Sequence, residues 1–130
     1  MKLVVIETPF AAPTADLRER NADYLKAAML DSLDRGEAPY ASHALYTQFL
    51  DDDIPGERRL GMEVGFAWGS RADEIVVYTD LGISRGMREG IARALASGKH
   101  VEYRSLGAEW LMRGCGCPET AHRFAATAAA

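Results

Sequence analysis

The sequence predicts an α/β fold in which helices cover both faces of a parallel sheet. Short β-branched apolar runs, such as 3–6 (LVVI) and 74–78 (EIVVY), are typical of strands buried on both faces. Segments with apolar residues at helical spacing separate these runs. A chain of 130 residues, 48% hydrophobic and 26% charged, has the size and composition of one globular domain. We therefore expect a Rossmann-like three-layer sandwich with a four- to five-stranded parallel sheet and right-handed crossovers.

The first strand and the first helix are predicted in the N-terminal third. Residues 2–7 form the strand, and the two prolines that follow it indicate a loop over residues 8–14. Thr14 suits the N-cap of a helix that extends to about Arg35, because its hydroxyl can accept a hydrogen bond from the first helical turn. Gly36 follows the last turn and is the expected stop of this helix.

The middle of the chain is expected to hold a weak strand, a long loop and a helix. Residues 38–42 form the strand, mainly because they follow a helix. The stretch 42–55 is irregular, and loops of about 12 residues inside a compact domain are often functional. Pro55 suits the first turn of a helix whose two apolar stripes cover a wide arc, so we expect this helix to be buried or to lie at a subunit contact. The stripes are Leu60, Val64 and Trp68 on one side and Met62 and Phe66 on the other.

The last third continues the alternation of strands and helices. Residues 74–78 form the clearest strand, a helix then extends to about Gly98, and residues 100–104 form a last short strand. The apolar stripe of this helix is Met87, Ile91, Ala94 and Leu95. We assign residues 1–104 to the α/β domain and residues 105–130 to a C-terminal extension that is partly flexible.

Charge and cysteine content exclude several classes of protein. A formal net charge of -4 without a long Lys/Arg run argues against binding a nucleic acid polymer. No apolar stretch reaches the length of about 18 residues that a membrane span needs, and the apolar run in residues 1–10 is too short for a signal peptide. The two cysteines, Cys115 and Cys117, are too few for a disulfide framework. We therefore expect a reduced, cytoplasmic protein.

Three loops should meet where ligands bind in open α/β sheets, at the carboxyl ends of the strands. They are residues 8–14, 42–55 and 79–86. The third loop leads into a helix with Ser84 as its N-cap and Gly86 in its first turn, so the N–H groups there can bind a phosphate or a carboxylate. The same pattern also arises from a plain N-cap followed by a turn glycine.

Other polar residues have both a functional and a structural interpretation. His43, just past a strand end, can hydrogen-bond a ligand or transfer protons, or it can be a satisfied structural histidine. The three acids 51–53 can ligate a hard cation, although such a run more often leads into a helix N-terminus. Cys115 and Cys117 with His122 fall short of the four ligands of a tetrahedral zinc site. We expect neither a metal nor a cofactor.

Four segments of the chain resemble the nucleoside 2-deoxyribosyltransferase-like superfamily, and in particular its small phage and bacterial domains. They are ETPF, PYASHALYTQFLDDD, RRLGMEVGFAW and ADEIVVYTDLGISRGMREGIARALASGKHVEYR, of which the first is the least specific. Together they cover nearly the whole chain up to about Arg104. The resemblance implies a homodimer that associates through helices such as the one carrying Trp68.

The resemblance also implies where a catalytic acid would lie. In enzymes of this superfamily, a loop-to-helix motif after the third strand carries a Glu that attacks the sugar carbon, and in one branch a Ser that holds the 5'-phosphate. Ser84 and Gly86 match this motif, but Gly90 stands at the Glu position. The nearest acid, Glu89, comes one residue early, and one residue turns a side chain by about 100° around a helix.

Two functions remain as hypotheses. The first is an enzyme that transfers or hydrolyses the N-glycosidic bond of a nucleotide or deoxynucleotide, with Glu89 and Asp80 as candidate catalytic residues. The second, which Gly90 favours, is a non-catalytic module that binds a nucleotide as a sensor or sequestering protein. In both, the partner is a small nucleotide or nucleoside whose base, sugar and 5'-phosphate stay open. The residues expected at the ligand are Pro9, Phe10, His43, Tyr46, Ser84, Gly86 and Met87.

Overall fold

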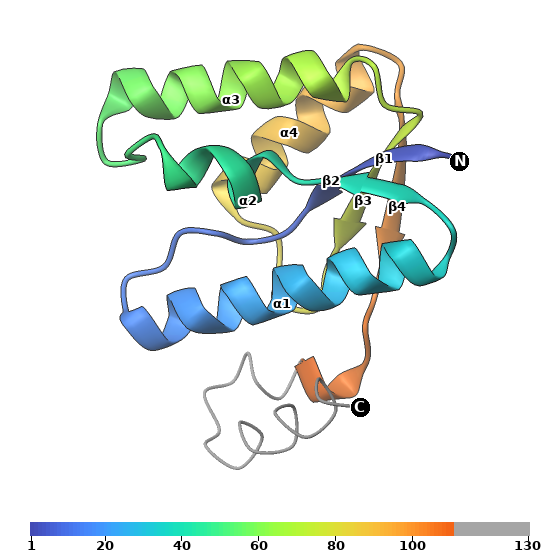
Figure 1. The fold of residues 1–130 in the computed structure, drawn as a ribbon, viewed down its shortest axis with the longest axis horizontal. Helices are drawn as coiled ribbons and strands as arrows, with labels where there is room; N and C mark the ends of the chain where they lie inside the picture. Colours follow the sequence, from blue (N-terminus) through green and yellow to red (C-terminus); the bar gives the residue numbers. More distant parts are fainter. Residues whose placement is uncertain (111–130) are drawn as a thin grey trace.

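The computed structural model describes residues 1–110 and has the expected α/β fold, with a single four-stranded sheet in which every strand is parallel to its neighbours. Helix α1 covers one face of the sheet, and α3 and α4 cover the other (Figure 1). The elements along the chain are β1 (Leu3–Glu7), α1 (Ala15–Asp34), β2 (Ala38–Tyr40), α2 (Ser42–Leu45), the 3₁₀ turn η1 (Tyr46–Gln48), α3 (Pro55–Gly69), β3 (Glu74–Tyr78), α4 (Arg85–Ala96) and β4 (His100–Arg104).

The strand order β2-β1-β3-β4 places the first strand at the centre of the sheet. After β1 the chain moves to one side to form β2, and it then returns to the other side of β1 to form β3 and β4. The register pairs Glu7 with Val77, so β1 and β3 end next to each other. This is the point at which the strand order switches direction, and ligands of open α/β sheets bind outside it.

Alternation along β1 decides which side chains face which helices. Successive side chains of a strand point to opposite faces, so Val4 and Ile6 face α1 while Val5 and Glu7 face α3 and α4. The core on the α1 side consists mainly of Val4, Ile6, Tyr24, Ala28, Val76, Tyr78 and Trp110. The core on the other side consists of Val5, Ala72, Ile75, Val77, Met87, Ile91 and Ala94. Trp110 shows that part of the predicted C-terminal extension packs against the domain.

The two predicted N-cap residues are confirmed by their capping hydrogen bonds. The hydroxyl oxygen of Thr14 accepts a hydrogen bond from the N–H of Leu17 at 3.2 Å, and that of Ser84 accepts one from the N–H of Met87 at 3.3 Å. Gly36 follows α1 with a φ of +79°, a left-handed conformation that glycine adopts without a steric cost.

The prediction of one irregular loop over 42–55 is wrong at its beginning, because α2 and η1 lie there and β2 ends at Tyr40. Side chains support these short turns: Thr47 donates to the carbonyl of His43, and Gln48 donates to the carbonyl of Ala44. Close packing against α3 also contributes. A Cβ atom on Gly65 would lie 2.7 Å from the hydroxyl oxygen of Ser42, so only glycine lets α2 approach α3 at this point.

For α3 the alternative of burial is wrong, while that of a subunit contact stays a prediction, and one residue of α4 is more exposed than expected. Helix α3 has no fully buried residue, and Leu60 and Trp68 are 54% and 57% exposed. A cavity separates α3 from the sheet and α4, and α2 covers only part of this helix. Leu95, expected on the inward stripe of α4, is 59% exposed because one residue beyond the buried Ala94 lies about 100° further around the helix. Within residues 1–110, no helix is both long and apolar enough to cross a membrane.

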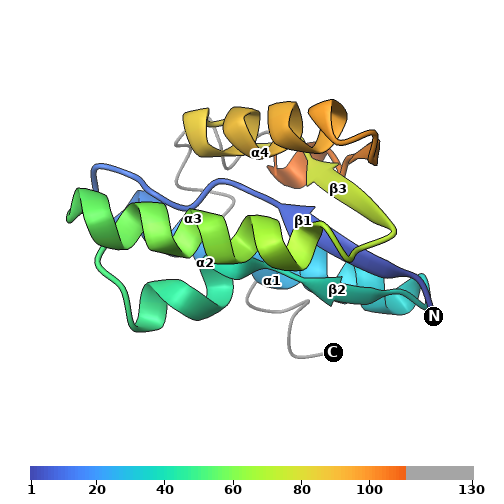
Figure 2. The same cartoon turned by 90° about the horizontal axis from the view of Figure 1, so that it is seen from above.

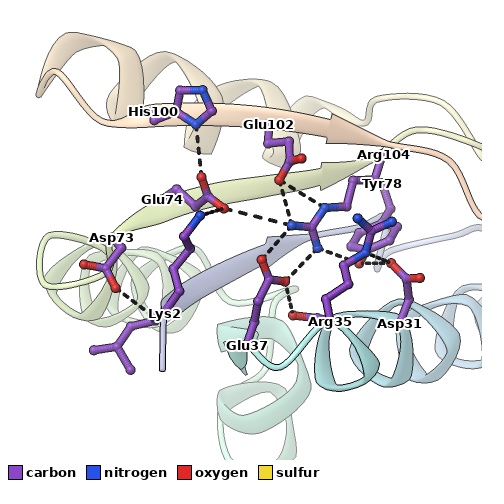
Figure 3. A network of polar contacts seen from close by, with 12 residues as sticks. Lys2, Asp31, Arg35, Glu37, Asp73, Glu74, Tyr78, His100, Glu102 and Arg104 are labelled. Carbon is purple, nitrogen blue, oxygen red and sulfur yellow. Dashed lines mark hydrogen bonds and ion pairs between the residues drawn. The ribbon is translucent and has the colours of Figure 1, made fainter.

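A buried arginine joins the edge strand to the rest of the domain (Figure 3). Arg104, at the end of β4, donates two hydrogen bonds of 2.8 and 2.7 Å to the carboxylate of Glu37, which precedes β2. It also donates to Glu102 at 2.7 Å and lies 3.9 Å from Glu74. The hydroxyl of Ser32 donates to Glu37 as well. The hydrogen bonds from Arg104 are the main reason that the pKa of Glu37 lies below its usual value.

We predict that Arg104→Met lowers the free energy of unfolding by about 3–5 kcal/mol, because it leaves the carboxylate of Glu37 buried without its cation and leaves Glu74 with Lys2 as its remaining cation. Urea denaturation at pH 7 measures the change. Arg35→Met is the matched control. It removes a half-exposed ion pair with Asp31 and should cost at most about 1 kcal/mol. A loss of equal size in both variants would contradict the prediction.

Acid pH should distinguish the same two variants. Because the folded pKa of Glu37 is lowered from 4.5, its pairing with Arg104 contributes stability above about pH 4.5, and this contribution disappears as the pH falls through the folded pKa. The wild type and Arg35→Met should therefore both lose this part of their stability in acid. Arg104→Met should have lost it already at neutral pH.

Candidate functional site

A cavity of about 720 Å³ lies between α3 and α4, over the face of the sheet that contains Val5 and Glu7. Figure 2 shows these two helices side by side on that face. The segment after β1 and the short helix α2 complete the lining at the carboxyl ends of the strands. Small-molecule sites in proteins generally have volumes of about 300–1,000 Å³, so the cavity is large enough for one.

Six of the residues predicted from the sequence line this one cavity: Phe10, His43, Tyr46, Ser84, Gly86 and Met87. They come from three separate parts of the chain, which the switch in strand order brings together. Pro9, Asp80 and Glu89, which were also predicted, are not among the residues that line it. The three segments therefore meet at the cavity as expected, but three of the predicted side chains do not line it.

His43 is held in place by the residue that follows β1. Its Nε2 atom shares a hydrogen bond of 2.8 Å with the hydroxyl of the buried Thr8, and its ring lies edge-on to Phe10 with 6.2 Å between ring centroids. Burial lowers the pKa of His43 to about 4, so the imidazole is neutral at pH 7. A neutral imidazole offers a hydrogen bond to a ligand and adds no positive charge to the site.

The N-terminus of α4 opens into the same cavity. Ser84 uses its hydroxyl oxygen as the cap, and the N–H groups of Arg85 and Gly86 have no intrahelical partner because they belong to the first turn. Arg58 of α3 reaches across to this turn, and its guanidinium lies 4.0 Å from the point where a Cβ of Gly86 would be. Sequence reasoning missed Arg58, because its position on a different helix does not show that it lies near Ser84.

The side chain of Glu89 lies outside the cavity. It pairs with Arg85 at 3.5 Å and with Arg58 at 4.0 Å, and it is 38% exposed. It lines an adjoining groove between α4 and α3, and Arg58 lines both this groove and the cavity. This placement agrees with the turn of about 100° that separates position 89 from position 90 on a helix. The catalytic role of Glu89 stays a prediction, and its two arginine partners do not favour it.

Asp80 has a different set of contacts from those expected. Its carboxylate accepts hydrogen bonds from the hydroxyl of Tyr24 at 2.5 Å, the hydroxyl of Ser105 at 2.6 Å and the N–H of Leu106 at 2.7 Å. Burial acts to raise the pKa of Asp80, but these hydrogen bonds outweigh it and lower the pKa. Asp80 thus fixes residues 105–107 to the sheet, and its contact with a ligand stays a prediction.

Glu7 brings an unpaired carboxylate to the cavity, and sequence reasoning missed it. It is the last residue of β1, and among the residues that the structure describes its carboxylate has no hydrogen-bond or ion-pair partner. Burial alone raises its pKa to about 7. The signal that could have identified it is an acid that ends a strand of apolar residues, LVVIE, at a carboxyl end.

Gly90 of α4 makes room for this carboxylate. A Cβ atom on Gly90 would lie 2.5 Å from Oε1 of Glu7 and 3.1 Å from its carboxyl carbon. Real Cβ atoms essentially never come this close to another heavy atom. The glycine that departs from the expected motif is therefore the residue against which Glu7 lies.

The described residues do not offer a convincing metal site. Within residues 1–110, the carboxylates of Glu37, Glu74 and Glu102 are close enough together to share an ion. However, the guanidinium of Arg104 lies among them and supplies the positive charge (Figure 3). Asp53 donates its N–H to the carboxylate of Asp51, a turn before α3. The predicted Cys115, Cys117 and His122 group lies outside the described residues.

We predict that Glu7→Gln stabilises the protein at pH 8 and has little effect at pH 5. The folded pKa of about 7 lies above the ordinary 4.5, so stability is complete below about pH 4.5 and decreases as the pH rises through 7. An amide removes this dependence. The gain at pH 8 should approach an upper limit of about 3 kcal/mol, measured by urea denaturation. The exposed Glu19→Gln is the control, and an effect of Glu7→Gln that is equal at both pH values would contradict the prediction.

Comparison with known proteins places this fold in a family. No curated protein and no solved structure matches the chain. Residues 2–104 match a family described as a domain of unknown function (DUF7768), and this segment extends from β1 through β4. Since the match covers well over half of the sequence, the chain belongs to the DUF7768 family.

Proposed function

We propose that the chain binds a nucleotide or deoxynucleotide in this cavity and transfers or hydrolyses its N-glycosidic bond. The observation that carries the proposal is the convergence of six predicted ligand residues around one cavity at the switch point of the sheet. Those residues were chosen from sequence segments that resemble the nucleoside 2-deoxyribosyltransferase-like superfamily. The resemblance supplies the substrate class, and the cavity supplies a place for it.

The lining of the cavity suits the three parts of a nucleotide. Phe10 and Tyr46 offer aromatic surface for a base. The neutral His43 offers a hydrogen bond to the base or the sugar. The first turn of α4 and the guanidinium of Arg58 offer N–H groups and positive charge for a phosphate. This arrangement needs few basic side chains, which is consistent with the net charge of -4.

An enzyme fits the cavity better than a binding module, because the cavity contains a carboxylate. Chemistry at an anomeric carbon generally uses a carboxylate as nucleophile, acid or base. In the sequence, the glycine at position 90 and the displaced Glu89 were the features that favoured a module without catalysis. Glu7 removes that objection, since it brings a carboxylate to the cavity from a different element. The non-catalytic nucleotide-binding module remains the alternative.

We predict that a nucleoside or deoxynucleoside 5'-monophosphate raises the melting temperature of the protein and releases its base during incubation. A panel with each common base, tested with and without the phosphate, would be followed by thermal shift and by chromatography of the released base. Arg58→Ala should weaken binding of the preferred monophosphate about tenfold or more, and that of the nucleoside much less. A thermal shift without base release would favour the binding module. The absence of both a thermal shift and base release would overturn the proposal.

We also propose that two copies associate through α3. No residue of this 15-residue helix is fully buried, and Leu60 and Trp68 on its outer stripe are more than half exposed. The neighbouring Phe49 and Ile54 are exposed as well. Apolar surface gathered on one side of a domain is typical of a protein contact. A second copy of the chain would cover it and would place the same helix on both sides of the contact.

Light scattering after gel filtration should give the mass of a dimer for the wild type. Leu60→Asp should give a monomer, because it places a charge in the apolar contact. The exposed Glu19→Gln should stay dimeric. A monomeric wild type at every concentration tested would contradict the association.

A further inference from the structure

The carboxylate of Glu7 lines the cavity and has no partner among the described residues that would stabilise its charge. Acids at the end of a strand are normally exposed or paired, since burial of an unpaired carboxylate costs free energy. Glu7 is half-buried, and no hydrogen-bond or ion-pair partner of its carboxylate is found among residues 1–110. Its side chain lines the cavity and lies against Gly90 of α4.

The other acids near the cavity are in different situations. Glu63 lines it, but its side chain is 56% exposed and pairs with Arg93 at 3.4 Å. Asp52 lines it from an exposed position. Glu89 lies outside and pairs with two arginines. Among the described acids that line the cavity, Glu7 is therefore the one that is both half-buried and unpaired.

We propose that Glu7 is the catalytic carboxylate of this site and that Gly90 lets it lie in its present position. The inference rests on the proposed function, because it assigns the acid of that reaction. Its geometric basis is that positions 7 and 90 face the same space: a side chain at position 90 would begin where the carboxylate of Glu7 now lies. A carboxylate can therefore reach this point from the sheet or from the helix, and in this chain it comes from the sheet.

Glu7 can act as a proton carrier during hydrolysis. The ionised carboxylate takes a proton from a water molecule while the water oxygen forms a bond to the anomeric carbon. The bond between that carbon and the base nitrogen breaks, and its electron pair leaves with the base. The protonated Glu7 then returns the proton to the departing base, so that water is consumed and the free base and the sugar phosphate are released. A pKa of about 7 suits a group that both accepts and donates a proton near neutral pH.

The first experiment removes the acid without changing its shape. Glu7→Gln should lower the rate of base release by about 10²- to 10⁴-fold, the usual contribution of general acid–base catalysis. Binding of the preferred nucleotide, measured by thermal shift and calorimetry, should be retained. Glu19→Gln is the matched control on the exposed side of α1.

The second experiment tests the pairing with Gly90. Gly90→Ala should lower the rate of base release, because its Cβ would lie 2.5 Å from Oε1 of Glu7 and would displace the carboxylate. When position 7 is Ala, Gly90→Ala should have no further effect, since no carboxylate is then displaced. Glu7→Ala/Gly90→Glu moves the carboxylate from the sheet to the helix and should regain base release relative to Glu7→Ala. This regain is a result that a purely structural role of Glu7 would not produce.

The outcomes separate the inference from the function on which it rests. If the wild type and Glu7→Gln release base at the same rate, Glu7 is not the catalytic acid, although the proposed reaction stands. If Gly90→Ala releases base as fast as the wild type, the pairing of positions 7 and 90 is wrong. If the wild type binds nucleotides but releases no base from any of them, the proposed reaction and the role of Glu7 are both overturned.

Discussion

The position of β1 at the centre of the sheet is the constraint on which the rest of this structure depends. The strand has β2 and β3 as neighbours and helices over both faces, so nearly every side chain that it contributes must be apolar. Val4, Val5 and Ile6 meet this requirement. The strand then ends at Glu7, which still pairs with β3 and lines the cavity. Because side chains alternate along a strand, Glu7 must face the same side as Val5, where α3 and α4 leave space between them.

Glu37 and Glu7 have carboxylates in opposite environments. On the α1 side of the sheet, Glu37 is paired with Arg104 and hydrogen-bonded, and its pKa is lowered. On the other side, Glu7 is half-buried without a partner, and desolvation raises its pKa to about 7. The first arrangement ties the edge strand to the turn before β2. The second costs stability at neutral pH, and acids with a pKa perturbed in this way are found disproportionately at functional sites.

Much of the fold could be predicted, because local signals and the fold agreed. Thr14 and Ser84 mark helix starts through the capping preference of hydroxyl side chains, and Gly36 marks a helix end through its positive φ. The loops that line the cavity follow from the rule that binding occurs at the carboxyl ends of parallel strands. The short helix α2 was not predicted, and the alternative that α3 is buried was wrong. Both depend on contacts between helices, such as that of Gly65 with Ser42, which sequence periodicity does not encode.

The sequence by itself determined the α/β class, the order of the elements and the loops that line the cavity. Apolar periodicity and capping are local properties of the chain, so they can be read without coordinates. Only the tertiary structure decided which carboxylate enters the cavity. Glu7 and Gly90 are separated by 83 positions, and their relation is a distance across the space between β1 and α4. Such a distance results from strand register and helix packing together, so neither residue alone signals it.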